Sequence, residues 1–320
     1  MRIKSLLALT LIGISGLTSA QPYPTKPIRL IVPFPAGGGS DIVGRIVATR
    51  LTEQLKQQVV VDNRGGAGGS IGTEAAVRAA PDGYTAVLAS TSEIAVNPAL
   101  YTRLAYDTVR DLAALALVAT TPVVLVVHPS LPARNIKELI ALAKARPGEI
   151  NMASAGNGTF THLSGEFFKS VTAAALTHVP YKSAPIALAD LAAGQVQIMF
   201  SSLPAAMGII NAGKVRPIAV STAQRTENLP QVPTVMESGV PAYDVVYWYG
   251  TFAPAATPRD ITAQLHAEIS RALRAPEVVA SLGRQGATAG ALSQAQFTDF
   301  VRSEHARWGK VARATGIKLD

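Results

Sequence analysis

The sequence predicts an α/β protein built from two lobes that are joined by two crossing strands. Short apolar, β-branched segments alternate with helical patterns along the chain, which is typical of largely parallel sheets covered by helices. Two strand candidates, Val123–Val127 and Val245–Phe252, differ from the rest because each lies near a change of region. We expect them to cross between the lobes. The first lobe would then hold residues 21–122 and 251–320, and the second lobe residues 123–250.

The first residues have the layout of a secretory signal peptide. Basic Arg2 and Lys4 precede the apolar run Leu6–Leu17, and the small residues Thr18–Ala20 follow it. The run is shorter than the roughly 20 residues of a bilayer span. We therefore expect residues 1–20 to be a leader that is cleaved near Ala20, and the mature chain to be free in the bacterial periplasm. The sequence has no cysteine, which excludes disulfides, thiolate metal sites and a lipid anchor on an N-terminal Cys.

The predicted elements follow in chain order. The predicted strands are Ile28–Val32, Val59–Val61, Thr85–Leu88, Val123–Val127, Ile198–Phe200, Ile218–Val220 and Val245–Phe252, with a further apolar strand beginning at Ile150. The predicted helices are Ile42–Leu55, Thr73–Ala79, Ile136–Ala145, Leu163–Val171, Ala184–Ala193, Ile261–Ala275, Glu277–Leu282 and Gln294–Ala314.

Two glycine- and hydroxyl-rich turns each join a predicted strand to a predicted helix. The first contains Gly37-Gly38-Gly39-Ser40-Asp41, and the second contains Gly156-Asn157-Gly158-Thr159. A helix start carries unpaired N–H groups and a partial positive charge, so it can hold an anion without a cationic side chain. Glycine also lets the backbone approach that anion closely. The pair of turns indicates a site where each lobe holds one end of a small acid.

Composition agrees with a folded protein that binds a small solute. The chain is 48% hydrophobic and 16% charged, and the roughly 300 residues left after the leader are enough for two domains. The formal charge of +8 falls to +6 when Arg2 and Lys4 leave with the leader. The basic residues are scattered singly, without the clusters and interleaved aromatics of a nucleic-acid groove, so no nucleic-acid partner is expected.

Enzyme motifs in the chain are weak. Gly68-Gly69-Ser70-Ile71-Gly72 matches the G-x-S-x-G pattern of a hydrolase nucleophile, but residues 62–66 would place a long loop before it in place of a sharp elbow. The overlapping glycines from Gly66 to Gly72 approach a dinucleotide fingerprint but lack its acidic partner. No histidine has a metal-ligand neighbour at the usual spacing, and no pair of carboxylates suggests acid–base catalysis. We expect no catalytic residue, no metal and no cofactor.

Two features leave alternatives open. His162 falls in the first turn of the helix after the second glycine turn, where it either packs beneath the turn or contacts a ligand. Trp248, with Tyr247 and Tyr249 beside it, is either the core of a strand or an aromatic wall of the cleft.

A series of segments resembles the Bug family, the periplasmic receptors of tripartite tricarboxylate transporters. These segments occur in the expected order over the whole mature chain. They are Tyr23-Pro24-x-Lys26-Pro27-Ile28, Val32-Pro33-Phe34-x-Ala36-Gly37-Gly38-Gly39-Ser40-Asp41, Asp62-Asn63-Arg64-x-Gly66-Ala67-Gly68-Gly69, Pro81-Asp82-Gly83-Tyr84-Thr85, Asn97-Pro98-x-Leu100-Tyr101, Gly156-Asn157-Gly158-Thr159-x-x-His162-Leu163, His178-Val179-Pro180-Tyr181-Lys182, Pro233-Thr234-Val235-x-Glu237-Ser238-Gly239 and Phe252-Ala253-Pro254-Ala255.

The resemblance implies a type II periplasmic-binding-protein (Venus flytrap) fold. Such a receptor closes over a small organic acid (a di- or tricarboxylate or an aromatic acid) and delivers it to membrane permease subunits; we expect a monomer. The family pattern places the ligand at the two glycine turns and on the first-lobe strand end. The expected ligand-binding residues are Phe34, Ala36, Gly38, Gly39, Ser40, Asp41, Ser90, Ser92, Ser154, Gly158, Thr159, Thr161, His162 and Ser201.

Three positions depart from the family pattern. Ser183 stands where glycine is usual, and Ser201 and Ser202 stand where an aspartate is frequent. Phe160 replaces a small hydroxyl residue in the second turn. Loss of an acidic group disfavours an amino-acid ligand, and Phe160 adds apolar area that suits an aromatic or branched acid. Two other functions stay open on the sequence: a secreted serine hydrolase that uses Ser70, and a receptor that senses a carboxylate without importing it.

Overall fold

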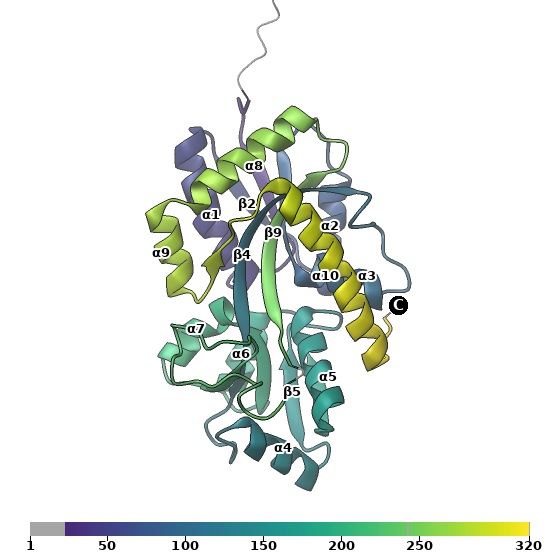
Figure 1. The fold of residues 1–320 in the computed structure, drawn as a ribbon, viewed down its shortest axis with the longest axis vertical. Helices are drawn as coiled ribbons and strands as arrows, with labels where there is room; N and C mark the ends of the chain where they lie inside the picture. Colours follow the sequence, from purple (N-terminus) through teal and green to yellow (C-terminus); the bar gives the residue numbers. More distant parts are fainter. Residues whose placement is uncertain (1–22, 242, 320) are drawn as a thin grey trace, which may run out of the picture.

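The computed structural model describes residues 23–241 and 243–319, so the expected leader lies outside the described residues. The chain forms two lobes joined by long strands, with mixed α/β structure in each lobe (Figure 1). The predicted α/β class and two-lobed architecture are confirmed. Within the described residues, no helix is both long and apolar enough to cross a bilayer.

One lobe, at the top of Figure 1, begins with β1 (Ile28–Val32), which pairs in parallel with β2 (Val59–Asn63) and β3 (Thr85–Ser90). Helices surround this sheet. They are α1 (Gly39–Leu55), α2 (Ser70–Val77), α3 (Asn97–Leu100), α8 (Arg259–Leu273), α9 (Pro276–Arg284) and α10 (Gln294–Thr315), with short turns η1 (Ala67–Gly69) and η2 (Ser92–Val96), the latter a π-helix.

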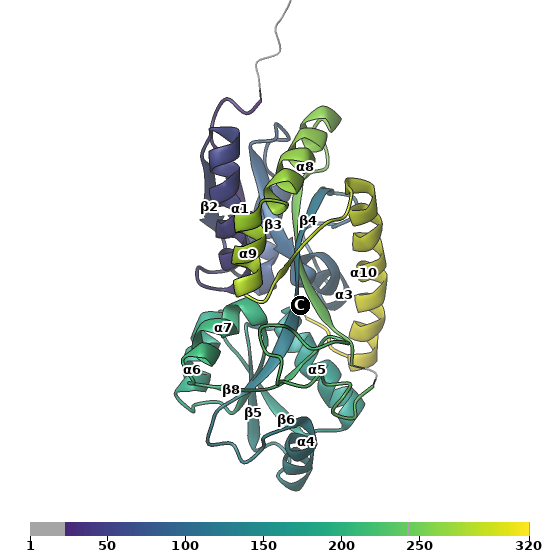
Figure 2. The ribbon, with the colours of Figure 1, turned by 60° about the vertical axis from the view of Figure 1, so that its left-hand side comes forward.

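The other lobe contains β5 (Ile150–Ser154), β6 (Leu176–Pro180), β7 (Ile198–Ser202) and β8 (Arg216–Val220). Its helices are α4 (Ile136–Ala145), α5 (Phe160–Thr172), α6 (Ala184–Ala192) and α7 (Leu203–Asn211). Figure 2 shows α6 and α7 on one side of this sheet and α4 and α5 on the other.

Two antiparallel strands connect the lobes. In β4 (Leu112–Val127), residues from Leu112 to Pro122 pair with β9 (Val246–Pro254), whereas Val123–Val127 pair with β7 and β8. The short β10 (Thr288–Ala289) also pairs with β4. The resulting sheet has the order β2-β1-β3-β9-β4-β7-β5-β6 and runs through both lobes. The predicted segment Val123–Val127 is thus the final third of a much longer strand.

The apolar run in β4 is explained by burial on both faces. Val123, Leu125 and Val127 pack into the large core shared with α4 and α5, while Val124 and Val126 pack into a second core with α6 and α7. A strand covered on both faces is continuously apolar and does not alternate. The full length of β4 was not predicted because Val118 is the only β-branched residue from Ala113 to Ala119.

Strands β6 and β10 and helix α7 were absent from the predicted set, as was the four-residue helix α3. The edge strand β6 contains Thr177 and His178 and is partly exposed, so it lacks an apolar run. The two-residue β10 is too short for a pattern. Helix α7 begins at Leu203-Pro204, and proline in a first turn is compatible with a helix because its missing N–H needs no partner there.

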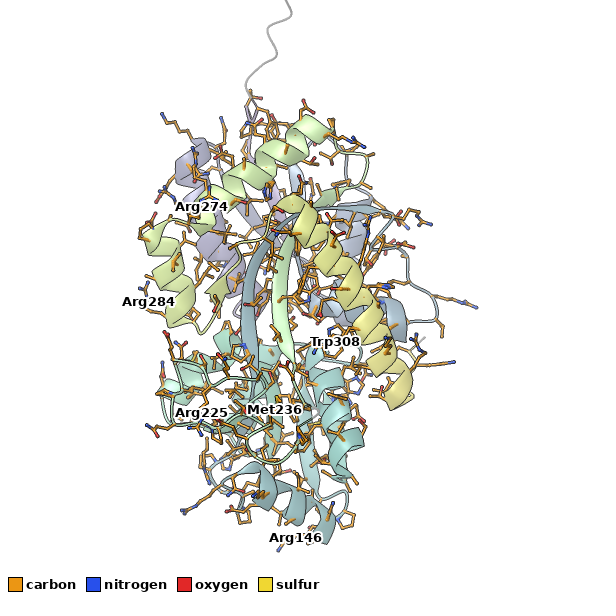
Figure 3. All side chains as sticks on the ribbon, in the orientation of Figure 1. Arg146, Arg225, Met236, Arg274, Arg284 and Trp308 are labelled. Carbon is orange, nitrogen blue, oxygen red and sulfur yellow. The ribbon has the colours of Figure 1, made fainter. Side chains whose placement is uncertain are left out.

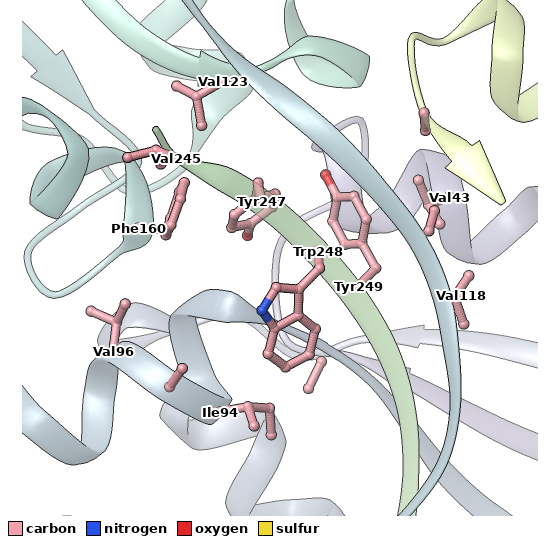
Figure 4. Packing of buried hydrophobic residues seen from close by; sticks show 14 of the residues in the cluster. Val43, Ile94, Val96, Val118, Val123, Phe160, Val245, Tyr247, Trp248 and Tyr249 are labelled. Carbon is pink, nitrogen blue, oxygen red and sulfur yellow. The ribbon is translucent and has the colours of Figure 1, made fainter. Parts of the chain in front are cut away.

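The centre of the molecule is an aromatic core around β9. Trp248 is fully buried in this core (Figure 4). It packs against Phe297 and Phe300 of α10, and its indole N–H donates to Glu304 at 3.0 Å. Trp308, also buried, donates to the same carboxylate at 2.9 Å. In contrast, Arg146, Arg225, Arg274 and Arg284 are exposed and spread over both lobes (Figure 3).

A pair of glycine variants tests how tightly β4 is packed. A Cβ on Gly290 would collide with the backbone carbonyl of Leu117, whereas a Cβ on Gly283 in α9 meets nothing within 4 Å. We expect Gly290→Ala to lower the free energy of unfolding by about 1–3 kcal/mol, because the backbone has to shift. Gly283→Ala should be neutral or stabilise by up to about 1 kcal/mol. Equal melting curves for the two variants would contradict this packing.

Candidate ligand-binding site

A small cavity lies between the lobes, where both glycine turns meet β9. Its volume is about 40 Å³, which is enough for a few water molecules. It is lined by Phe34, Pro35, Gly38, Gly39, Ser40, Ser92, Ala155, Thr159, Phe160, Thr161, Ser183, Ala184, Pro185, Ser202, Tyr247 and Tyr249. No Lys, Arg, His, Asp or Glu is among these lining residues. Its polar groups are therefore backbone amides, hydroxyls and phenols.

Three helices begin at the cavity without a capping side chain. Gly38 precedes α1, Ser183 precedes α6 and Ser202 precedes α7, and at none of the three does a side chain accept a bond from the helix start. All three residues line the cavity. Because the first N–H groups of a helix need partners and carry partial positive charge, the three starts together favour an anion in the cavity.

An unpartnered phenol points to the same place. Tyr249 is fully buried, and its hydroxyl has no hydrogen-bond partner among the described residues. A Cβ on Gly39 would collide with this hydroxyl and with that of Ser202, so all three groups converge at the start of α1. Buried polar groups are normally paired. The Tyr249 hydroxyl is thus available as a donor to a bound anion.

Asp41 stabilises the first glycine turn through hydrogen bonds and an ion pair. Its carboxylate accepts from the Gly37 N–H at 2.9 Å, from Asn63 at 3.0 Å and from Arg45, which also forms an ion pair with it at 2.9 Å. Burial by itself would raise the pKa of Asp41, but the hydrogen bonds from Arg45, Gly37 and Asn63 outweigh it and lower the pKa. The Asp41 side chain therefore points into its own turn and does not line the cavity.

The second turn satisfies most of its own polar groups. The Thr159 hydroxyl donates to the Gly156 carbonyl at 2.7 Å and accepts from the His162 N–H as the cap of α5. The Thr161 hydroxyl accepts from the Ala155 N–H at 3.0 Å. The Phe160 N–H donates across the lobes to Ser92 Oγ at 3.0 Å. The second turn therefore offers few free hydrogen-bond donors. It contributes mainly to the shape of the cavity and to a hydrogen bond between the lobes.

Gly158 lies outside the cavity lining. Its φ of +77° favours glycine, and a Cβ there would lie 2.8 Å from Leu319 and 2.9 Å from Tyr101. In this structure the residue therefore packs against the C-terminal segment. Gly38, by comparison, lines the cavity with ordinary backbone geometry, and a Cβ there would lie 3.5 Å from the Pro35 carbonyl oxygen.

His162 packs beneath the second turn. Its ring stacks on His178 with centroids 3.9 Å apart, and its Nδ1 accepts from the Gly158 N–H at 3.4 Å. His178 in turn bonds Ser154 Oγ at 2.6 Å. Burial lowers the pKa of each histidine to about 4, so both rings are neutral at pH 7. A neutral pair of rings supports the turn without adding charge.

The structure brings half of the expected site residues to the cavity wall. Those that line it are Phe34, Gly38, Gly39, Ser40, Ser92, Thr159 and Thr161. Those that lie outside the lining are Ala36, Asp41, Ser90, Ser154, Gly158, His162 and Ser201. Several of the latter hold the lining in place, and whether any of them contacts a ligand stays a prediction.

Several lining residues lie outside the expected ligand-binding set, although the sequence analysis had noted Phe160, Ser183, Ser202 and the two tyrosines beside Trp248 for other reasons. Tyr247 and Tyr249 face the cavity while Trp248 faces the opposite way into the core, because neighbouring strand residues point to opposite sides (Figure 4). Ser183, Ala184 and Pro185 lie at the start of α6. Ser202 and Phe160 were departures from the family pattern and now line the cavity.

Comparison with known proteins identifies the family. A model described as the tripartite tricarboxylate transporter family receptor matches residues 43–317. The chain belongs to this family. Protein BugT of Bordetella pertussis is 39% identical over 308 residues, which cover 96% of this chain and 94% of BugT.

Solved structures of the family agree with the fold. R. palustris Rpa4515 with adipate is 36% identical, has a TM-score of 0.90 and covers 92% of this chain and 99% of its own. MatC (Rpa3494) from Rhodopseudomonas palustris with bound malate is 30% identical, has a TM-score of 0.87 and covers 91% of this chain and 100% of its own. The resemblance drawn from the sequence motifs is confirmed.

The hydrogen bonds that the Asp41 carboxylate accepts predict that its contribution to stability depends on pH. We expect Asp41→Asn to lower the free energy of unfolding by about 1–3 kcal/mol near neutral pH, since hydrogen bonds to a charge are lost. Because the folded-state pKa is lowered, this contribution is present above the unfolded pKa of about 4 and is lost as pH falls through the folded value.

Urea unfolding near neutral pH and near pH 3 measures this effect. The difference between the native chain and Asp41→Asn should shrink in acid. Asp299→Asn, at a side chain that is 77% exposed, is the control and should change little at either pH. A difference that is equal at both pH values would show that the Asp41 charge does not stabilise the turn.

Proposed function

We propose that this protein is an exported receptor that captures a small carboxylate between its lobes and delivers it to the permease of a tripartite tricarboxylate transporter. Family membership supports the receptor role. The convergence of three uncapped helix starts and the unpartnered Tyr249 hydroxyl on one cavity is the observation that carries the binding function. These groups match a carboxylate, which accepts several hydrogen bonds at once.

The ligand class follows from the family and the cavity. The solved relatives are described with adipate and with malate, both small carboxylates. In this chain the cavity lining includes four aromatic rings, those of Phe34, Phe160, Tyr247 and Tyr249. We infer that one carboxylate sits at the start of α1 while the rest of a di- or tricarboxylate or aromatic acid packs on these rings.

We further propose the division of lobes as residues 21–122 with 251–320, and 123–250. The change of pairing partner in β4 at Pro122/Val123 supports the first boundary. The mature receptor would act as a monomer in the periplasm after cleavage near Ala20. Delivery to a permease and sensing of the same acid use one binding site, and the transporter family favours delivery.

Binding without catalysis is part of the proposal. The Ser70 hydroxyl donates to the Ala67 carbonyl at 2.8 Å, and none of its bonds in the described part of the chain goes to a histidine. A serine nucleophile needs a base within hydrogen-bond reach. The observed contact instead supports a role for Ser70 in holding the η1 turn at the start of α2.

A thermal-shift screen tests the proposed function. About fifty small acids, adipate and malate among them, would be added to the mature protein. A true ligand at 100 times its dissociation constant adds about 2.7 kcal/mol to stability, which is a clear rise in melting temperature. Ser70→Ala should keep the same ligands, and no product should form. If no acid stabilises the protein, or if an ester is turned over and Ser70→Ala abolishes turnover, the proposal is wrong.

Two neighbouring glycines provide a sharper test of the site. We expect Gly39→Ala to weaken binding of the best acid at least tenfold, about 1.4 kcal/mol, because its Cβ occupies the space between the hydroxyls of Tyr249 and Ser202. Gly38→Ala is the matched control and should bind more tightly than Gly39→Ala, since its Cβ makes only an ordinary contact. Calorimetric titration measures both. Equal affinities would place the carboxylate elsewhere.

A further inference from the structure

A buried carboxyl group lies beside the cavity without a cationic partner. Glu93 is fully buried in the π-helix η2, an irregular helix type that is frequent at functional sites. Its Oε2 accepts from the Ser90 N–H at 3.0 Å and from the Ser90 hydroxyl at 2.5 Å. Its Oε1 has no hydrogen-bond partner among the described residues. An ionised carboxylate in this position would have hydrogen bonds to only one of its two oxygens and no exposure to solvent.

The groups around Glu93 do not neutralise a negative charge. The titratable side chains that interact with it electrostatically are phenols: Tyr247 and Tyr249 of β9, and Tyr106, whose hydroxyl donates to the Glu93 backbone carbonyl at 2.9 Å. Tyr101 follows α3 and interacts with Tyr106. The η1 turn presents only Gly69 to the Glu93 side chain.

The remaining packed helices also leave Glu93 unpaired. On α10 the buried charge is Glu304, which is held by the indoles of Trp248 and Trp308 and by Arg307 at 3.2 Å. The cations of α10 are exposed: Arg302, Arg307, Lys310 and Arg313. On α5, His162 is neutral and Glu166 pairs with Lys169 at 2.9 Å. Burial raises the pKa of Glu93 to about 7, against the lowering effect of its bonds to Ser90.

Two hydrogen bonds connect Glu93 to the cavity. The Tyr247 hydroxyl donates to Ser90 Oγ at 2.7 Å, and Ser90 Oγ donates to Glu93. Tyr247 itself lines the cavity and packs on Phe160 with ring centroids 4.6 Å apart. A carboxylate bound in the cavity would therefore be separated from the Glu93 carboxylate by only two hydroxyl groups, with little water between them. Two like charges at such a separation repel strongly.

We propose that Glu93 takes up one proton from solvent when the cavity binds a carboxylate, so that ligand capture is coupled to protonation of the receptor. The inference rests on the proposed function. The proton adds to the Glu93 carboxylate to give a neutral carboxylic acid, and no bond of the ligand changes. The bound anion then faces a neutral chain of Tyr247, Ser90 and Glu93. Because protonation and binding favour each other, the affinity falls as pH rises above the pKa of Glu93, by up to about tenfold per pH unit.

Calorimetry detects the proton directly. Adipate, or the tightest acid of the screen if adipate does not bind, is titrated in buffers of different ionisation enthalpy between about pH 6 and pH 9. Proton uptake by the native chain should be largest at a pH above the ligand-free pKa of about 7 and clearly smaller near pH 6, where Glu93 is already protonated. Glu93→Gln should bind with an affinity that no longer falls with pH and with no net proton uptake.

Glu304→Gln is the matched control, since Glu304 is also buried but bonds the two tryptophans and not the cavity chain. It should keep the proton uptake of the native chain. If Glu93→Gln does not fold, infrared difference spectra of the native chain on addition of acid supply the second measurement. Above neutral pH they should gain the carbonyl band of a buried protonated carboxylic acid.

The outcomes separate the two proposals. Binding with no proton uptake at any pH, or uptake that persists in Glu93→Gln, overturns the role of Glu93 and leaves the receptor function intact. Absence of the carboxylic-acid carbonyl band from the infrared spectrum of the liganded native chain would also overturn the role of Glu93 and leave the receptor function intact. Failure of every acid to bind overturns the receptor function and the coupling together.

Discussion

The proposed site depends on one constraint: a carboxylate bound in the cavity would be held by groups that carry no formal charge. Helix starts and hydroxyls supply only partial charges, and these are effective where water is largely excluded. A cavity of about 40 Å³ enclosed between two lobes provides such a place. Strand β4 positions the lobes for this, since it pairs with β9 over Leu112–Pro122 and continues into the other lobe, where Val123–Val127 pair with β7.

Contacts between the lobes meet at Phe160. Its N–H donates to Ser92 of the opposite lobe, and its ring lies between Tyr247 and Trp308, with centroid distances of 4.6 and 4.9 Å. Helix α10 thereby contacts the cavity-lining Phe160 through Trp308. A residue that departs from the family pattern thus joins the ligand cavity to the aromatic core. Such a position is well suited to register whether the lobes are closed.

Four groups with shifted pKa values, Asp41, His162, His178 and Glu93, stand one layer behind the cavity wall. Asp41 holds the first turn, the stacked pair of His162 and His178 supports the second, and Glu93 lies behind Ser90 and Tyr247. Hydrogen bonds lower the pKa of Asp41, so it stays ionised, and burial lowers the pKa of each histidine, so both stay neutral. Burial raises the pKa of Glu93 to about 7. The wall itself remains free of formal charge.

The sequence by itself determined the α/β class and the family, because apolar periodicity and sequence motifs are local properties, and it drew attention to the two glycine turns. Tertiary structure decided which groups face the cavity. The starts of α6 and α7 reach it because the sheet order places β6 and β7, the strands that precede these helices, on either side of β5. Alternation along β9 required Trp248 to oppose its two tyrosine neighbours, but only packing against α10 fixed which side faces the core. Likewise, the different surroundings of Gly39 and Gly158 come from segments distant in sequence, Tyr249 with Ser202 and Tyr101 with Leu319.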